Sequence, residues 1–328
     1  KLFVSKHRYL ASTLAFRMTL PNPFWQYNHK WSVVHHMKEL RETQLQYINP
    51  LDFLKDQVLM HLPYSFIWLA GLVWLLFYKS ATSYRLFAWI YLTVIILLLA
   101  TNGKNYYSLG AYPMLFAAGG VWLEQVTAAK NLWLRVASVS TICLLSVPLI
   151  PAALPIWKPV KLAAYFKKTG LDKAGACKWE DLQNHALPQD FADMLSWKEL
   201  GDKVSKVYKQ LPDSVRAKTL IYCRNYALAG AVTYYGKDLG QVTSDNASFL
   251  FWMPDKYNIR NLLFVGKRIP AKDDAVFQQF EKYTVVDSTT TPYAREQGVK
   301  IILFENGNDK VNGMIETGIK EKKDEFQR

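Results

Sequence analysis

The chain has 328 residues, of which 50% are hydrophobic, and its formal net charge is +13. A positive charge of this size indicates a nucleic-acid partner where Lys and Arg cluster on a soluble domain. Here they are spread along the chain, many beside apolar runs, so we interpret them as membrane-flanking charges and expect no nucleic-acid partner. Three cysteines exclude a disulfide scaffold. Cys143 lies in an apolar run, while Cys177 and Cys223 are either bridged or, as we favour, free thiols.

The first 61 residues contain one short apolar segment. The sequence begins at Lys1, and no secretory signal pattern follows it, which indicates a fragment of a longer protein. Residues 9–20 are too short to span a bilayer and include Arg17, so we interpret them as the end of a helix that begins upstream. An interfacial helix is the alternative. The rest of residues 1–61 is expected to form a loop outside the cytoplasm.

Four runs without Asp, Glu, Lys or Arg follow, at residues 57–78, 86–103, 105–123 and 136–157. Each is close to the length, about 17–25 residues, that a helix needs to cross roughly 30 Å of hydrocarbon. Four such runs in succession favour membrane helices over the buried helices of a soluble protein. The sequence thus predicts a multi-pass α-helical membrane region with four transmembrane helices in residues 62–157, surrounded by membrane lipid.

Basic residues in the connectors predict the orientation of these helices. They flank the first and third connectors, at Lys79, Arg85, Lys130 and Arg135. Short loops rich in Lys and Arg face the cytoplasm. By parity, the loop 101–107, residues 21–61 and everything after Lys158 lie outside, which predicts a multi-pass protein of the cell's inner (plasma) membrane with an extracytoplasmic C-terminal domain.

Residues 158–328 are charged and are predicted to form a soluble α/β domain. Prolines end the last apolar run at positions 148, 151, 155 and 159. The expected elements are helices at 190–210, 226–235, 273–283 and 309–328, and strands at 219–223, 261–265 and 299–304. Strands that alternate with helices indicate a mainly parallel sheet.

The loop between the second and third apolar runs reads TNGKNYYSLGAYP, residues 101–113. It places Lys104 beside Tyr106 and Tyr107 at the expected membrane surface. An ammonium supplies charge and phenols donate hydrogen bonds, so these side chains suit a phosphate. The alternative is a snorkelling lysine in an aromatic belt.

Several strings resemble segments of bacterial members of glycosyltransferase family 39, relatives of the dolichyl-phosphate-mannose protein mannosyltransferases, and they occur in that family's order. They are PNPFWQYNHKW, DFLKDQVLMHLPYSFIWLAGL, GKNYYSLGAYPMLFAAGGVWLE, LPQDFADMLSW and NYALAGAVTYYG. Together they cover most of the chain up to about residue 265. One departure is Lys30, where the family usually has Gly.

The resemblance implies a C-type membrane glycosyltransferase that moves a sugar from a polyprenyl-phosphate-linked donor to an extracytoplasmic acceptor. It implies that Lys104, Tyr106 and Tyr107 bind the donor phosphate, and that Trp25, Gln26 and His29 line the cavity from a second outer loop. The family's catalytic acid lies in its first outer loop, which has no counterpart here. The catalytic residue is therefore expected upstream of Lys1, and this chain alone is expected to be inactive.

Several of these residues have an alternative interpretation. Trp25 could instead be an interfacial anchor and His29 part of a solvated loop. His35 and His36 lack further ligands at suitable spacing, so no metal site is predicted, and no cofactor is assigned, although a divalent cation is left open. The sugar and the acceptor are not identified. The alternative function is a membrane-anchored ligand-binding or sensing protein with an outer α/β domain.

Overall fold

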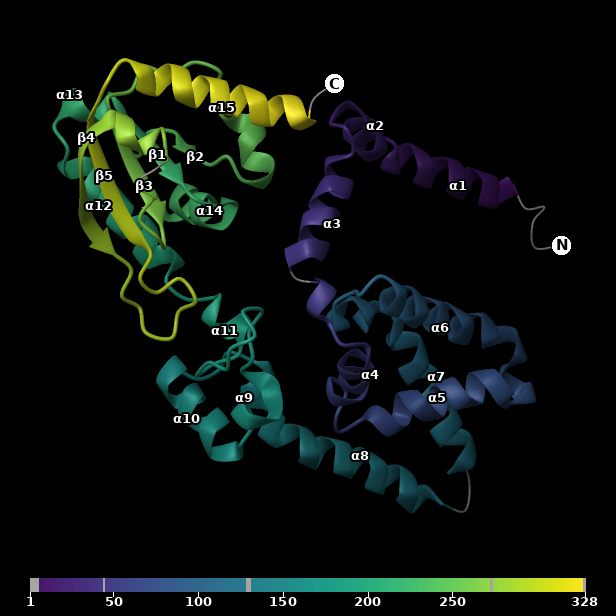
Figure 1. Ribbon diagram of the computed structural model, residues 1–328. Helices are drawn as coiled ribbons and strands as arrows, with labels where there is room; N and C mark the ends of the chain where they lie inside the picture. Colours follow the sequence, from purple (N-terminus) through teal and green to yellow (C-terminus); the bar gives the residue numbers. More distant parts are fainter. Residues whose placement is uncertain (1–5, 44, 128–130, 272–273, 327–328) are drawn as a thin grey trace. The chain divides into compact units, whose positions relative to one another are not determined.

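The computed structural model describes residues 6–43, 45–127, 131–271 and 274–326 (Figure 1). The chain divides into two compact units. The helical unit is Val34–Lys158, and the sheet unit combines Lys1–Val33 with Pro159–Arg328.

The helical unit consists of α-helices joined by short 3₁₀ segments. Its elements are the larger part of α3 (Ser32–Thr43), η1 (Leu45–Tyr47), α4 (Pro50–Leu59), α5 (Ser65–Phe77), η2 (Lys79–Tyr84), α6 (Arg85–Ala100), η3 (Asn105–Ala111), α7 (Pro113–Val126), α8 (Leu132–Ser146), η4 (Val147–Leu149) and α9 (Ile150–Ala153). Residues of α5, α6 and α7 share one apolar core, which includes Trp68, Tyr91 and Leu115.

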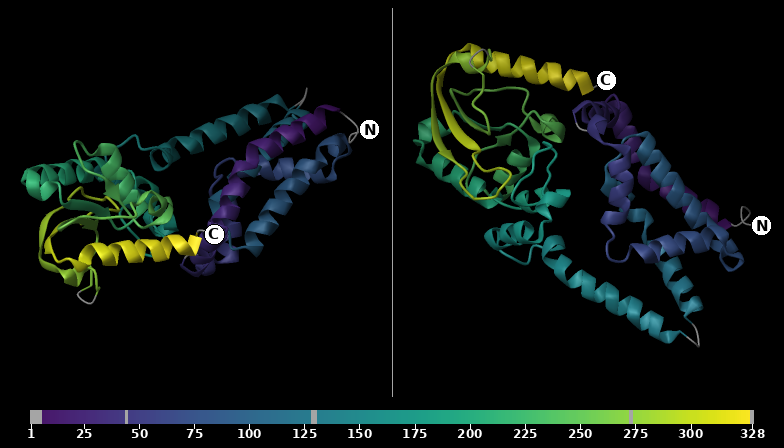
Figure 2. Two further views of the ribbon diagram at one scale, coloured as in Figure 1. Left: turned by 90° about the horizontal axis from the view of Figure 1, so that it is seen from above. Right: turned by 60° about the horizontal axis from the view of Figure 1, so that its bottom comes forward.

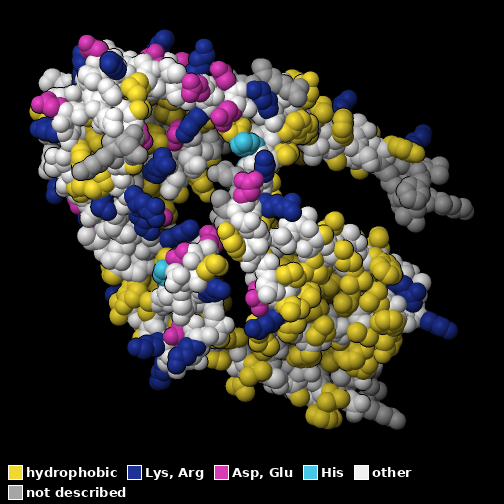
Figure 3. Space-filling view, viewed as in Figure 1, with side chains coloured by type: hydrophobic (Ala, Val, Ile, Leu, Met, Phe, Trp, Pro, Cys, Tyr) yellow, Lys and Arg dark blue, Asp and Glu magenta, His cyan; other side chains and the backbone are white. Residues whose placement is uncertain are grey.

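Two stretches of the described chain are long and apolar enough to cross a membrane, Lys79–Ala100 and Leu132–Ala153, each of 22 residues with mean hydropathy 1.9. They are mainly unburied, as is typical of helices that face lipid. Figure 3 shows hydrophobic side chains covering much of the visible face of the helical unit. These features support association with a membrane.

The prediction of a multi-pass region with four transmembrane helices is wrong. In residues 57–78 the chain turns after α4, and α5 has 13 residues, about 20 Å at 1.5 Å per residue. In residues 105–123, η3 occupies the start, and α7 has 14 residues. These two uncharged runs are therefore not continuous helices. The orientation derived from four crossings loses its basis, and Lys130 lies outside the described residues.

Helices α5 and α7 approach each other through two glycines. A Cβ added at Gly71 would lie 2.1 Å from the Leu115 carbonyl oxygen, and one added at Gly119 would lie 2.0 Å from the Ile67 carbonyl oxygen. Backbone contact of this kind is typical of helix pairs in membranes, where small residues replace the hydrophobic effect as the basis of packing. The two helices are thus in direct backbone contact.

The described residues of the sheet unit form five strands and the remaining helices. The strands are β1 (Thr219–Cys223), β2 (Val242–Thr243), β3 (Asn261–Gly266), β4 (Phe280–Ser288) and β5 (Lys300–Gly307). The helices are α1 (Lys6–Thr19), α2 (Pro21–Asn28), α10 (Pro159–Thr169), a π-helical segment η5 (Asp172–Ala176), α11 (Gln189–Ala192), α12 (Trp197–Gln210), α13 (Asp213–Arg216), α14 (Tyr226–Tyr235), η6 (Ala247–Trp252), η7 (Phe277–Gln279) and α15 (Lys310–Phe326).

The strand order is β2-β1-β3-β5-β4. β1 pairs in parallel with β2 and β3, whereas β5 pairs antiparallel with β3 and β4. All six residues of β3 are buried, as expected for a central strand covered on both faces. Helices α12 and α14 cover one face, and α15 packs on the other through Val311. Figure 2 shows α15 in yellow; Ile319 of α15 packs with Leu250 of η6.

Several sequence-based expectations are confirmed in this unit, and others are wrong. β1 and α14 have the predicted bounds, and the bounds of β3, β5 and α15 lie within three residues of theirs. The single helix at 190–210 is instead α11 and α12, which are separated by a turn with Ser196 at φ 71°. The helix at 273–283 is wrong, because η7 and the start of β4 occupy its described part; Asp273 lies outside the described residues. The sheet is mixed rather than mainly parallel. Cys177 and Cys223 are free thiols.

Glu199 links α12 by hydrogen bonds to the segment that follows β4. Its carboxylate accepts hydrogen bonds from the backbone N–H and hydroxyl groups of Thr290 and Thr291, at 2.5–3.0 Å, and pairs with Lys203 at 3.0 Å. Burial alone would raise the pKa of Glu199, but these bonds outweigh burial and hold the pKa well below its usual range. The charged form is therefore stabilised in the folded state.

We expect Glu199→Gln to lower the free energy of unfolding by about 2 kcal/mol at neutral pH, since hydrogen bonds to a charged group are lost. A depressed folded pKa contributes stability above the unfolded pKa, near 4.3, that is lost as the pH falls below it. The variant should therefore lose less stability than the wild type in acid. Denaturant unfolding at a series of pH values measures this, with exposed Glu321→Gln as the matched control. An equal acid response of E199Q and wild type would contradict the role.

Candidate functional site

The loop between α6 and α7 carries the predicted phosphate-binding side chains. Lys104 directly precedes η3 in an extended conformation and is half-buried. Tyr106 and Tyr107 follow in η3, 49% and 46% exposed, with their rings edge to face at a centroid distance of 4.8 Å. The structure thus brings one ammonium and two accessible phenols onto a single short segment. Such groups form charge-assisted and phenolic hydrogen bonds to an anion.

A buried hydrogen-bond network anchors this loop to α4. Gln57 is 3% exposed, and its Oε1 accepts hydrogen bonds from the hydroxyls of Ser108 at 2.5 Å and Tyr112 at 2.9 Å. Beside it, the Asn105 amide donates to the Asp56 carboxylate at 2.8 Å. A buried amide oxygen with two donors fixes the position of η3 on α4.

His61 completes the anchor from the turn after α4. Its ring is buried against Tyr112 at a centroid distance of 3.9 Å, and its Nδ1 lies 3.1 Å from the Gln57 carbonyl oxygen. Sequence reasoning missed Asp56, Gln57 and His61 as site residues. They could have been identified as polar side chains at the start of the apolar run 57–78.

The second predicted set, Trp25, Gln26 and His29, belongs to the sheet unit. The Trp25 and His29 rings stack at 4.0 Å, and Phe251 of η6 meets both edge to face. Gln26 Oε1 accepts hydrogen bonds from Ser32 Oγ at 3.2 Å and the Val33 N–H at 3.1 Å, at the start of α3. These contacts hold the turn after α2 in place. A role in lining a donor cavity stays a prediction.

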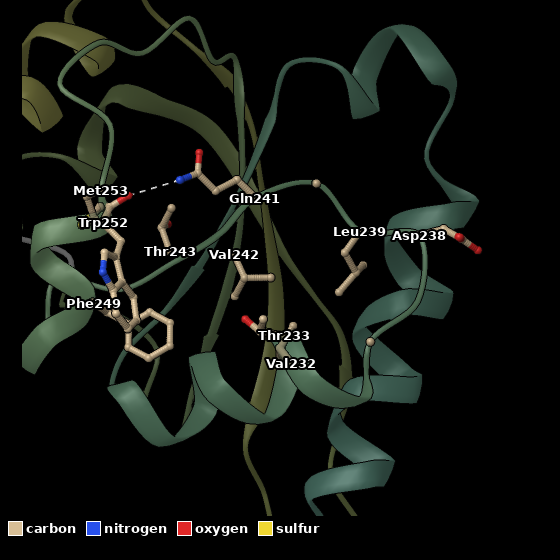
Figure 4. Close-up of a pocket in the computed structure, with 12 residues that line it drawn as sticks. Val232, Thr233, Asp238, Leu239, Gln241, Val242, Thr243, Phe249, Trp252 and Met253 are labelled. Carbon is tan, nitrogen blue, oxygen red and sulfur yellow. Dashed lines mark hydrogen bonds between the residues drawn. The ribbon is translucent and has the colours of Figure 1, made fainter.

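A pocket of about 520 Å³ lies in the sheet unit, between the end of α14, β2 and η6 (Figure 4). Its lining residues are Val232, Thr233, Gly236, Asp238, Leu239, Gly240, Gln241, Val242, Thr243, Phe249, Trp252 and Met253. In Figure 4 the rings of Phe249 and Trp252 lie on one side and Leu239 on the other. The volume falls within the roughly 300–1,000 Å³ that is typical of small-molecule sites. Sequence reasoning did not identify this pocket.

The polar groups around the pocket are held by hydrogen bonds. Gln241 Nε2 donates to the Trp252 carbonyl oxygen at 3.3 Å, and buried Thr243 donates to the Ile221 carbonyl oxygen at 2.8 Å. Asp238 pairs with Lys209 at 2.6 Å, and the hydrogen bond from Lys209 lowers the pKa of Asp238. The acidic side chain of the rim is thus neutralised by a lysine outside the pocket lining.

Among the described residues, no group of three or more His, Cys, Asp or Glu side chains could hold a metal ion. Comparison of the chain with known protein families, with curated proteins and with solved structures finds no match.

Proposed function

We propose that the protein is a membrane glycosyltransferase that moves a hexose or pentose from a polyprenyl-phosphate carrier to an acceptor outside the cytoplasm. The observation that carries this proposal is the loop with Lys104, Tyr106 and Tyr107, anchored on a unit with a broad apolar surface. A polyprenyl phosphate needs an apolar surface for its chain and a cation for its headgroup. The helical unit contains an apolar surface and, in the loop between α6 and α7, a cation.

The proposed role of the loop is to stabilise the leaving group. In the transfer, the acceptor oxygen bonds to the anomeric carbon, the bond from that carbon to the carrier phosphate breaks, and its electron pair goes to the phosphate. The acceptor proton passes to a base, to which no residue of this chain is assigned. Lys104 and a tyrosine hydroxyl would bind the phosphate as its negative charge increases. Donors fixed in advance where charge develops stabilise a transition state most.

Direct binding tests this proposal. The assay uses a polyprenyl phosphate of about ten isoprene units and the polyprenol of the same length. We expect the protein in lipid nanodiscs to bind the phosphate at least about tenfold more tightly than the alcohol, because contacts to the phosphate contribute about 1.5–3 kcal/mol. Native mass spectrometry with both lipids in competition measures the ratio. Equal affinity for the two lipids would exclude a phosphate site and leave only a hydrophobic surface.

The pocket beside η6 favours a second candidate function, a membrane-anchored protein that binds a small ligand without transferring a sugar. This alternative predicts ligand binding in the sheet unit and no preference for polyprenyl phosphate over polyprenol. The same competition experiment therefore separates the two functions.

We further propose that the protein lies in the plasma membrane with the loop and the sheet unit both outside the cytoplasm, because donor and acceptor must meet on one face. Single cysteines at Gly110 and Ser248, in a Cys143→Ser background, test this. A Cβ at Gly110 meets open space, and Ser248 is exposed. Cys177 and Cys223 are buried, and burial raises the pKa of both thiols, so both should stay unlabelled.

In sealed cells, both introduced cysteines should react with a membrane-impermeant maleimide. We take labelling above about four-fifths of that in permeabilised cells as full reaction. Reaction of only one would place the loop and the sheet unit on opposite faces. Protection of both would place them in the cytoplasm. Either result would overturn the proposed location.

A further inference from the structure

The pocket between α14, β2 and η6 combines an apolar interior with a polar rim. Val232, Thr243 and Met253 are buried, and Leu239, Val242 and Phe249 are half-buried. Thr233, Gln241 and Trp252 are exposed at the opening. Small-molecule sites have this composition: apolar and aromatic walls with a few polar groups that fix the orientation of the ligand.

The aromatic wall is accessible. Trp252 is 65% exposed, and its ring meets that of Phe249 edge to face at 5.0 Å. In an edge-to-face pair the edge of one ring covers at most one face of the other, so at least one face of the exposed indole is open to a ligand. The polarised C–H bonds on the flat face of a sugar ring are attracted to the electron-rich face of an indole.

The charge at the rim favours an uncharged ligand. Asp238 is the acidic residue of the lining, and Lys209 already pairs with it at 2.6 Å. In Figure 4 the Asp238 side chain points away from the aromatic rings. The Gln241 amide lies beside Trp252, and the Thr233 hydroxyl lies beside Val232 on α14; both donate and accept hydrogen bonds without carrying charge.

We propose that this pocket binds a neutral pyranose of the acceptor, with the apolar face of the sugar on Trp252 and its hydroxyls at Gln241 and Thr233. The identification of the sugar with the acceptor rests on the proposed transferase function, whereas sugar binding itself does not. A saturated ring without hydroxyls would use the aromatic wall but leave the polar rim unused.

The test is binding of methyl α-D-glucopyranoside, galactopyranoside and mannopyranoside to the full chain in nanodiscs, by saturation-transfer NMR. We expect at least one to bind, and Trp252→Ala to weaken it about tenfold or more. Gln241→Leu should weaken binding of the sugar. It should leave binding of cyclohexylmethanol unchanged, because this control has a saturated ring that bears no ring hydroxyls. Tyr234→Ala is the matched aromatic control, because Tyr234 is 81% exposed and is not part of the pocket lining.

Absence of binding by all three glycosides, unchanged binding in W252A, or equal binding of cyclohexylmethanol and the best glycoside would each overturn the proposal. Because no transfer is measured, these outcomes do not depend on the donor site. Lys104→Ala should bind the glycoside as the wild type does, so a failure of the transferase proposal and a failure of the pocket proposal are distinguishable.

Discussion

Replacing Lys104 by alanine is expected to weaken binding of the polyprenyl-phosphate donor by about ten- to a hundredfold. A charge-assisted contact to phosphate contributes about 1.5–3 kcal/mol, which converts to that range. An interfacial lysine that only snorkels would contribute far less. The measurement is donor affinity in nanodiscs.

Two variants control for the loss of a positive charge as such. Lys79→Ala removes an exposed lysine at the start of η2 and should leave donor affinity unchanged. Lys104→Arg keeps the charge and should retain most of the affinity, whereas a merely structural role of the lysine side chain would be disturbed by both substitutions. If K104A folds normally and binds donor as K79A does, Lys104 has no role in phosphate binding.

Gly119→Ala is expected to destabilise the helical unit by about 3 kcal/mol or more. The added methyl would lie 2.0 Å from the Ile67 carbonyl oxygen, so backbone rather than a flexible side chain would have to move. Overpacking in a well-packed core costs about 1–3 kcal/mol even where side chains can adjust. Thermal unfolding of the purified protein in detergent, followed by the circular dichroism of its helices, measures the effect.

The next residue provides the control. A Cβ at Gly120 has no heavy atom within 4 Å, so Gly120→Ala should be neutral or stabilising by up to about 1 kcal/mol through helix propensity. Similar unfolding midpoints for G119A and G120A would show that α5 and α7 are not in backbone contact.

The local pattern of the sequence was sufficient for elements that are bounded by clear signals. The Asn225 side chain caps α14 by accepting a hydrogen bond from the Leu228 N–H, and Gly236 follows the last residue of the helix, so both ends were predictable. β4 was missed because six of its nine residues are exposed, and such a strand is stabilised by pairing with β5 rather than by an apolar pattern of its own. Pairing with a strand that lies elsewhere in the chain leaves no pattern of apolar residues within β4 itself.

The limits of the site prediction have the same origin. Lys104, Tyr106 and Tyr107 are neighbours in sequence, so their presence on one loop could be predicted. The anchor could not, because Ser108 and Tyr112 reach Gln57 across 51 and 55 residues. The pocket likewise requires η6 to return to the end of α14. The wrong prediction of four membrane helices has a different cause. The absence of charged residues does not show where a helix ends and the chain turns.

The glycine contact between α5 and α7 also bears on the thermodynamics of binding. The η3 loop leads into α7, which the two glycines hold against α5, and Gln57 of α4 accepts hydrogen bonds from Ser108 and Tyr112, so the loop proposed to bind phosphate is held on two sides. A loop already ordered before its ligand arrives loses little conformational freedom on binding. Donor association should therefore be fast and nearly independent of loop closure, with differences in affinity among headgroup variants expressed mainly in the dissociation rate.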